Sequence, residues 1–427
     1  MSLGIFLENK ILLGRVNMKN TYIDLFKMIK GSLKIEKDNL SEGDIDWDEI
    51  LKLSSEHKIV PMVYEAVNKT ENFQSLNPEM KNIWKSYAMQ NIFSQVQRSN
   101  RFLQIYNEFN KSNIKVLVFK GIILRELYPV PDERVSGDED MLVNKEDLQT
   151  CLDILEKNGL ERVLSEEDDA DVYHYFCNKT GLHLELHTNL FGKGKSAYSH
   201  MNNIFTDVFE DADIININGV DVSTFSLDKH FLYVICHAIK HFVGCGTGIR
   251  QLCDICMYIE AYYDKINWNY IWKEIKTLGY DTLFVNFLQV GIDYLGLDEN
   301  KVVYVKDKSN YYINTYDLIE DIMEGGIYGA STQARLNAAN MSLDALSKES
   351  KSKVKSNLAA IFPKTENLKG RYEYLEKYPF LLPVAWGDRI IKYVKDRGSL
   401  SEVKHTAKET IEVGNKRIDL LKKYKLI

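Results

Sequence analysis

Acidic residues at two places in the sequence have the types and the spacing of a metal-binding site. The first place is the string Arg134-Val-Ser-Gly-Asp138-Glu-Asp140-Met-Leu-Val143, which predicts a short strand. Residues two apart on a strand point to the same face, so Asp138 and Asp140 would present paired carboxylates there. The repulsion between two such charges is relieved when a divalent cation lies between them, and oxygen-rich sites favour Mg²⁺ or Mn²⁺.

The second place is a strand candidate further along the chain, where apolar and polar residues alternate. On the string Leu182-His-Leu-Glu185-Leu-His187 the leucines would face one way, and His183, Glu185 and His187 would face the other. Glu185 is therefore a candidate for a third carboxylate on a neighbouring strand. The alternative is that residues 138–140 form a solvated acidic turn. The order of these pieces along the chain adds support to the metal site but leaves both interpretations open.

A lysine and a glycine lie upstream of the carboxylates, where a strand gives way to a helix. The run Lys115-Val-Leu-Val-Phe119 predicts a strand covered on both faces, and Lys120-Gly121 follows it directly. Gly121 would let backbone amides approach a phosphate at the start of the helix, and Lys120 would add a positive charge. Three carboxylates opposite such a glycine predict a two-metal phosphoryl-transfer site, in which the metals neutralise a triphosphate and activate an incoming hydroxyl.

The elements that must position these residues change in kind along the chain. Residues 1–112 read as helical, whereas residues 113–195 alternate strand and helix and finish with a hairpin. The helical pattern returns over residues 196–322, and residues 323–427 form a last helical region. The segment Met80–Ser112 is either one long amphipathic helix or two short ones. This order predicts an α+β module inside helical wrapping.

Composition limits the class of protein further. A chain of 427 residues with 45% hydrophobic residues can bury large cores in two or three domains, which excludes a disordered protein. Its 61 acidic and 54 basic residues give a net charge of −7, which disfavours a nucleic-acid partner. Six cysteines are too few for a secreted disulfide framework, and no run of about 18 apolar residues predicts a membrane span. We therefore expect a cytoplasmic location.

A resemblance to a known family is carried by Lys120-Gly121, Leu127-Tyr128-Pro129, Arg134, Asp138-x-Asp140-x-Leu142-Val143 and Leu184-Glu185-Leu186-His187. These motifs resemble the uncharacterised bacterial nucleotidyltransferase family of the DNA polymerase beta-like superfamily. The resemblance implies a small mixed-sheet core embedded in mostly α-helical N- and C-terminal regions. It also implies Mg²⁺ (or Mn²⁺) and a nucleoside triphosphate, from which a nucleoside monophosphate passes to a hydroxyl. A looser similarity extends from Asp46-Trp47 to Arg371-Tyr372.

The resemblance also implies roles for individual residues. Asp138 and Asp140 would ligate both metal ions, and Glu185 would ligate one of them and help to deprotonate the acceptor hydroxyl. Lys120 and the amide of Gly121 would hold the triphosphate. We expect ATP to be the donor and AMP to be the group transferred, to an unidentified small molecule or protein.

Two residues leave alternatives open. Arg134 would either stabilise the leaving pyrophosphate or brace the loop before the aspartates. Glu139 stands where the superfamily normally has an apolar residue, so its charge would have to face solvent or a partner such as Arg134. Because Glu139 could also loosen the strand or add a ligand, the alternative function is a catalytically weak or inactive nucleotide-binding regulatory protein of the same fold.

A predicted helix downstream carries further candidates. His237, Lys240 and His241 lie on its polar face at helical spacings, where His237 and Lys240 could contact the nucleotide. The alternative for His237 is a hydrogen-bonded bridge to Asp254 that fixes two helices. Residue types that bind zinc also occur in this region, at His237, His241, Cys245, Cys253 and Cys256. The last two cysteines fall within an apolar run, which favours packing over zinc binding.

Overall fold

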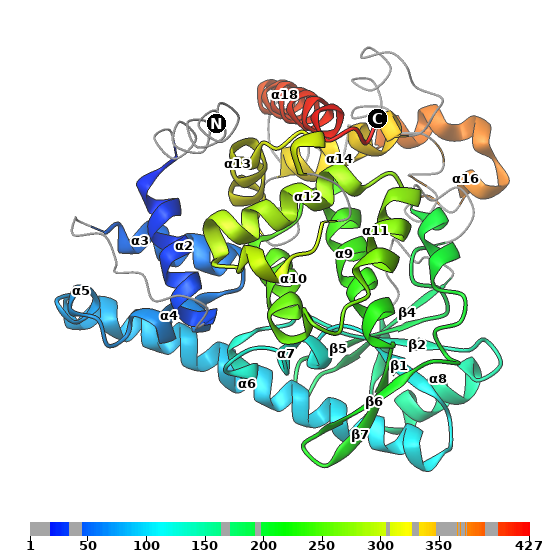
Figure 1. Ribbon diagram of the computed structural model, residues 1–427. Coiled ribbons are helices and arrows are strands. Elements are labelled where there is room, and N and C mark those ends of the chain that lie inside the picture. Colours follow the sequence, from blue (N-terminus) through cyan, green and yellow to red (C-terminus); the bar gives the residue numbers. More distant parts are fainter. Residues whose placement is uncertain are drawn as a thin grey trace.

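The computed structural model describes residues 18–33, 45–163, 171–192, 198–304, 308–326, 333–346, 374–388 and 400–427, together with residues 365, 368 and 372. A mixed sheet lies at one end of the molecule, and helices from both sides of it in the sequence cover the remainder (Figure 1). The chain is therefore an α+β core inside helical regions, as the sequence predicts.

Five strands form the sheet in the order β1-β2-β5-β4-β3. The strands are β1 (Val116–Val118), β2 (Glu139–Val143), β3 (Glu161–Val163), β4 (Val172–Cys177) and β5 (Leu182–His187). Only β2 and β5 run parallel; the other neighbours are antiparallel. The β2–β5 register sets Asp140 directly beside Glu185, so two of the expected acidic residues lie on adjacent strands.

The two faces of the sheet pack differently. One face contributes alternate residues of β1, β2 and β5 to an apolar cluster with α6 (Pro78–Lys111) and α8 (Leu148–Lys157). The three leucines of β5 belong to this cluster and are fully buried. The opposite face is where Glu185 and His187 emerge, towards α9 (Leu227–Val243) and α10 (Ile249–Tyr262). Strand alternation thus separates the packing face from the polar face.

Helix α6 is a single helix rather than two. It starts at Asn77, whose side chain accepts a hydrogen bond from the Met80 N–H at 2.8 Å, with Pro78 at the first helical position. Its 34 residues correspond to a length of about 51 Å. The first half packs in the large helical core through Trp84, and the second half packs on the sheet through Phe102 and its neighbours. In Figure 1, α6 runs across the lower part of the molecule, from the helical region on the left to the sheet on the right.

A hairpin corrects the prediction that residues 196–322 are helical throughout. Strands β6 (Asp213–Ile217) and β7 (Val220–Thr224) pair with each other and place Ile217 and Val222 in the sheet's apolar cluster. The turn is Asn218-Gly219, in which both residues have positive φ angles of 49° and 82°. Asn-Gly is a strong signal for such a two-residue turn, so the sequence contained the information.

The remaining elements form the helical regions. The helices before α6 are α2 (Asn20–Leu33), α3 (Trp47–Glu56), α4 (Val60–Val67) and α5 (Glu71–Gln74). Those after the hairpin, besides α9 and α10, are α11 (Trp268–Thr277), α12 (Asp281–Val290), α13 (Thr315–Gly325), α14 (Gln333–Leu346), α16 (Tyr374–Lys377) and α18 (Leu400–Lys423). Short helical turns are α7 (Ile122–Arg125), Pro131–Glu133, Ser199–Ile204, the π-helical Gly291–Leu295, Glu299–Lys301, Lys308–Asn310 and Pro379–Leu381.

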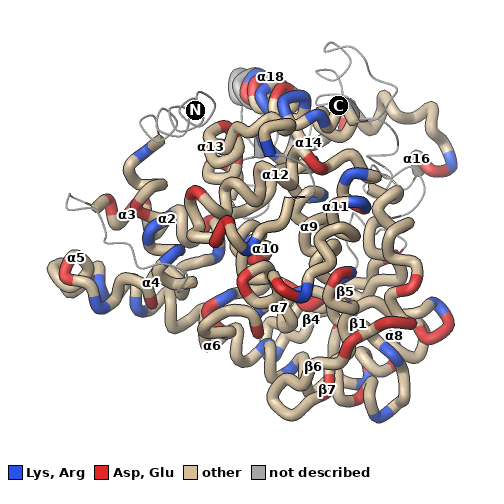
Figure 2. The backbone as a smooth tube through the Cα atoms, in the orientation of Figure 1, with Lys and Arg blue, Asp and Glu red and all other residues tan. Residues whose placement is uncertain are grey.

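Charges of both signs are interspersed along these elements, α18 included (Figure 2). All six cysteines are free thiols. Among the described helices, none combines the length and the apolar character needed to cross a lipid bilayer.

Candidate active site

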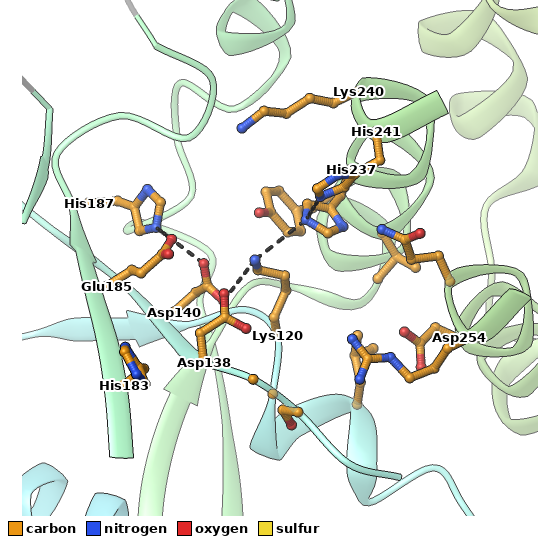
Figure 3. Close-up of a pocket in the computed structure, with 18 of the residues that line it drawn as sticks. Lys120, Asp138, Asp140, His183, Glu185, His187, His237, Lys240, His241 and Asp254 are labelled. Atoms are coloured by element: carbon orange, nitrogen blue, oxygen red, sulfur yellow. Dashed lines mark hydrogen bonds and ion pairs between the residues drawn. The ribbon is translucent and has the colours of Figure 1, made fainter. Parts of the chain in front are cut away.

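A cavity of about 650 Å³ lies between the polar face of the sheet and helices α9 and α10. Asp138, Asp140 and Glu185 line its sheet side, and His237, Lys240 and His241 line the helix side (Figure 3). The structure therefore brings the three predicted carboxylates to one cavity, opposite the polar face of the predicted helix. Lys120, Gly121 and Arg134 line the same cavity.

Three side chains on β2 and β5 form a group that could hold a metal ion. Asp140, Glu185 and His187 each offer a donor atom, and these atoms lie within 4.8 Å of one another. The His187 Nε2 atom is 3.2 Å from Asp140 Oδ1 and 3.3 Å from Glu185 Oε2. Asp138, which precedes β2, lies in the cavity but outside this group. The donor set fits a divalent cation because two carboxylates and an imidazole are common ligands of such ions.

The local charges change the titration of this group. Burial raises the pKa of Glu185, but hydrogen bonds from His174 and His187 and the charge of Lys120 outweigh it, so the net pKa is lowered. Burial lowers the pKa of His187, yet its hydrogen bonds to Asp140 and Glu185 reverse the sign and raise it. Burial raises the pKa of Asp138. Glu185 is therefore ionised at neutral pH.

Lys120 lies between the acidic side and the helix side of the cavity. Its Nζ atom is 2.8 Å from Asp140 Oδ2 and 3.4 Å from His237 Nε2. Burial lowers the pKa of Lys120, but the nearby charges of Asp140 and Asp138 raise it well above the ordinary value. Lys120 is accordingly a fixed ammonium group that faces both the carboxylates and the remaining cavity space.

Glu139 points away from the cavity, which corrects the expectation that it faces solvent or Arg134. It is 2% exposed, its Oε1 is 2.8 Å from Arg125 Nη2, and its Oε2 accepts a hydrogen bond from the Ile122 N–H at 2.7 Å. The carboxylate thus caps the short helix α7. Gly121 is required beside it, because a Cβ atom there would lie 1.8 Å from Glu139 Oε2 and the residue has a φ of 48°.

Arg134 braces two segments within the fold. Its guanidinium donates to both carboxylate oxygens of Asp254 on α10, at 2.8 and 2.6 Å, and Asp254 also accepts from the Tyr128 hydroxyl at 2.7 Å. Arg134 is 4% exposed, so these contacts are buried. Nearby, Arg250 donates to the carbonyl of Val135. Of the two expected roles, bracing the loop before Asp138 is the one that the contacts support.

His237 contacts Lys120 and His241 rather than Asp254. The His237 Nε2 atom lies 3.0 Å from His241 Nε2 as well as close to the lysine. Burial, followed by the charge of Lys120, lowers the pKa of His237 well below its usual value, and burial with Lys240 and Lys120 lowers that of His241 to about 3. Both imidazoles are therefore neutral, and His237 is placed to accept a hydrogen bond from the lysine.

Several cavity residues were not singled out from the sequence, namely Lys58, His174, Tyr233 and Arg250. His174 lies opposite Glu185 on β4, and its Nδ1 is 3.5 Å from Glu185 Oε1. The turn at residues 178–181 sets the register of the hairpin, and this register pairs His174 with Glu185. The position of His174 beside Glu185 could therefore have been predicted from the sequence. Lys58 comes from the turn after α3, where its positive φ of 54° has no counterpart in a sequence pattern.

The cysteines do not form a zinc site with the nearby histidines. Cys253 and Cys256 are buried in the large helical core, where they pack as small apolar side chains. Within the part of the chain that the structure describes, Asp140, Glu185 and His187 are the only group of three potential metal ligands.

Comparison with known families identifies one match. A family model described as an uncharacterised nucleotidyltransferase matches residues 43–293, which is more than half of the chain. The matched range contains all the cavity residues named above. It does not reach the looser similarity at Arg371-Tyr372, of which Arg371 lies outside the described residues. Comparison with curated proteins and with solved structures gave no match.

Proposed function

The chain belongs to the uncharacterised nucleotidyltransferase family, and from this premise we propose that it transfers AMP from ATP to a hydroxyl of a small molecule or protein. The observation that carries the proposal is the polar wall of one cavity. Asp140 and Glu185 lie side by side on parallel strands, Asp138 lies in the same cavity, and Lys120 stands within ion-pair distance of Asp140.

The residues present fit a divalent metal in this cavity. Asp140, Glu185 and His187 would hold one ion, and Asp138 with Asp140 would hold a second together with the nucleotide's phosphates. When bound, Mg²⁺ or Mn²⁺ would neutralise phosphate charge and make the acceptor hydroxyl a better nucleophile.

The transfer itself is a substitution at the α-phosphorus. The acceptor oxygen forms a bond to the α-phosphorus, the bond from that phosphorus to the bridging α–β oxygen breaks, and pyrophosphate leaves. Glu185 would help to remove the hydroxyl proton, since its carboxylate lies on the polar face of the cavity beside Asp140. Lys120 would hold the triphosphate and offset the charge on pyrophosphate.

The opposite wall supplies further positive charge. Lys240 of α9 and Arg250 of α10 line the helix side of the cavity, and Lys58 from the turn after α3 lines it as well, which suits a polyanionic nucleotide. Arg134 would act indirectly, because its guanidinium holds the loop of Asp138 against α10 through Asp254. The same indirect role fits His237, which contacts Lys120.

A nucleotide-transfer assay tests the proposal. The full chain is incubated with α-labelled ATP and Mg²⁺ or Mn²⁺ in the presence of pooled metabolites or proteins, and pyrophosphate release and label transfer are measured. Asp138→Asn and Asp140→Asn should abolish both signals, whereas His183→Gln, an exposed residue near the start of β5, should retain them. Equal turnover in the wild type and the two aspartate variants would contradict the proposal.

The alternative, a nucleotide-binding regulatory protein without transfer, predicts a different result. Calorimetry would then detect ATP binding that depends on Lys120 and Asp140, while no acceptor pool releases pyrophosphate. The buried ion pair of Glu139 on the packing side of β2 supports the transfer proposal, because the alternative was considered on the ground that Glu139 could loosen the strand or add a ligand.

A further inference from the structure

We infer that the metal site formed by Asp140, Glu185 and His187 is a mixed oxygen and nitrogen site, in which His187 ligates the ion through Nε2 and selects Mn²⁺ over Mg²⁺. The inference deepens the proposed function, since it concerns the metal of the same cavity. It rests on where the imidazole lies, which the superfamily pattern of three carboxylates does not include.

The position of His187 is that of a ligand. It follows Glu185 by two residues on β5 and therefore projects from the same face. Its Nε2 atom is nearly equidistant from the two carboxylates, at 3.2 Å from Asp140 Oδ1 and 3.3 Å from Glu185 Oε2. A small cation lying among these three atoms would meet all of them without a change of strand register.

Packing holds the imidazole in this orientation. The His187 side chain is only 9% exposed, and the ring of Phe119 lies edge-on to it at a centroid distance of 5.4 Å. Phe119 is itself stacked on Phe225 at 5.3 Å, with an interplanar angle of 4°. The imidazole is thus held by Phe119, the residue after β1, which Phe225, the residue after β7, supports in turn.

Ligand chemistry then indicates the ion. Mg²⁺ takes almost only oxygen ligands and keeps much of its water, whereas imidazole nitrogen is a good ligand for transition metals. Mn²⁺ shares the preference of Mg²⁺ for carboxylate oxygens. As a transition metal it also accepts an imidazole nitrogen, which Mg²⁺ rarely does. Two carboxylates with one imidazole therefore favour Mn²⁺ over Mg²⁺.

Lys120 limits how Asp140 can bind. The ammonium group is 2.8 Å from Asp140 Oδ2, while Oδ1 faces His187. Without nucleotide, Asp140 would accordingly offer one oxygen to the ion and the other to the lysine, and Oδ2 would become available to a second ion only when Lys120 moves to the triphosphate. We expect one Mn²⁺ per chain in the absence of nucleotide, because a second ion would need phosphate oxygens as additional ligands.

Electron paramagnetic resonance of bound Mn²⁺ tests the inference directly. The chelator-treated full chain is titrated with Mn²⁺, and electron spin echo modulation is recorded for the ¹⁴N signals of a coordinated imidazole. We expect one bound ion per chain, imidazole coupling, and tighter binding of Mn²⁺ than of Mg²⁺ in competition. Absence of nitrogen coupling in the wild type, or equal affinity for the two ions, would overturn the inference, and this measurement needs no variant.

Three histidine variants assign the coupling. His187→Gln should lose the ¹⁴N signal and weaken Mn²⁺ binding by at least about tenfold, while Mg²⁺ binding changes little. His183→Gln is the matched control, because His183 lines the cavity from the same strand face but lies outside the ligand group. If the signal survives in His187→Gln and disappears in His174→Gln, the assignment of His187 is wrong.

The result is separable from that of the proposed function. Imidazole-coordinated Mn²⁺ in a chain that transfers no nucleotide would leave the inference standing and remove the function. Nucleotide transfer with a metal that shows only oxygen ligands would support the proposed function and contradict the inference about His187.

Discussion

Replacement of Glu139 tests whether this residue belongs to the fold or to the catalytic centre. Glu139 and Arg125 form an ion pair of 2.8 Å in which each side chain is only 2% exposed. Removing one member of a buried pair leaves the other charge uncompensated. Glu139→Leu should therefore destabilise the protein strongly, while the ligands that face the cavity stay in place.

The magnitude follows from the contacts that are lost. Leaving a buried charge without its partner costs about 3–5 kcal/mol, and the Ile122 N–H loses its acceptor at a further cost of about 1–3 kcal/mol. Arg125 keeps a hydrogen bond to the Ser99 hydroxyl at 3.0 Å, which offsets part of the loss. We expect the free energy of unfolding to fall by about 3–5 kcal/mol.

The assay compares matched variants by urea unfolding followed by circular dichroism, with hydrogen exchange locating the affected segments. Glu126→Ala is the control, because Glu126 follows α7 and is exposed, so its loss should stay within about 0.5 kcal/mol. The double variant Glu139→Leu with Arg125→Met removes both charges and should be less destabilised than Glu139→Leu alone. Hydrogen exchange should increase in residues 116–125 and 139–143.

Two results would refute this reasoning. One is a loss of less than about 1 kcal/mol in Glu139→Leu, which is too small for a broken buried pair. The other is a stable Glu139→Gln variant that no longer binds Mn²⁺, which would mean that the carboxylate is a metal ligand in the cavity.

Three further predictions concern other parts of the fold. Gly121→Ala should lower the melting temperature, because the new Cβ would overlap the Glu139 carboxylate and the φ of 48° strains a residue with a side chain. Calorimetry of Gly121→Ala, Glu139→Ala and the double variant should show losses that are less than additive, since the overlap is absent in the double variant. Asp254→Asn should lower kcat by loosening the loop that Arg134 braces, while leaving Mn²⁺ affinity nearly unchanged; unaltered kinetics would exclude the bracing role. Burial lowers the pKa of His230 to about 4, so the neutral ring is favoured in the folded protein. In the unfolded chain the ring has its ordinary pKa of 6.5, so the unfolded state takes up a proton below that pH while the folded state does not. The free energy of unfolding should therefore fall by about 3 kcal/mol as the pH drops from 6.5 towards 4. Urea unfolding across this range should show a weaker pH dependence in His230→Asn.

The sequence predicted the polar face of the sheet because strand alternation is a local property. Asp138 and Asp140, and likewise Glu185 and His187, are two residues apart, and that spacing alone places each pair on one face. The parallel pairing of β2 with β5 is not local. That the two pairs meet was inferred from the order of the strand candidates along the chain and from the family resemblance, not from spacing.

Partners that come from distant parts of the chain could not be predicted in the same way. Glu139 was expected to face solvent or a partner such as Arg134, but it pairs with Arg125, which α7 turns towards α6. Arg134 is held instead by Asp254, which lies 120 residues further along the chain. No spacing rule links such positions, because the contact depends on how α10 packs against the loop. The Asn218-Gly219 turn, by contrast, was a local signal that was missed.

The length of α6 has a consequence for how the protein could be dissected. Halfway along it, Gln95 accepts the Ser136 N–H at 2.8 Å, so one continuous rod touches the helical core, the loop before Asp138 and the sheet. A truncated chain that begins just before β1 would lack the α6 side chains that bury the apolar face of the sheet. It would also lack Gln95, which binds the loop before Asp138. A fragment that keeps the candidate site would therefore have to start no later than Asn77. A fragment or chimera that contains the sheet without α6 should not fold.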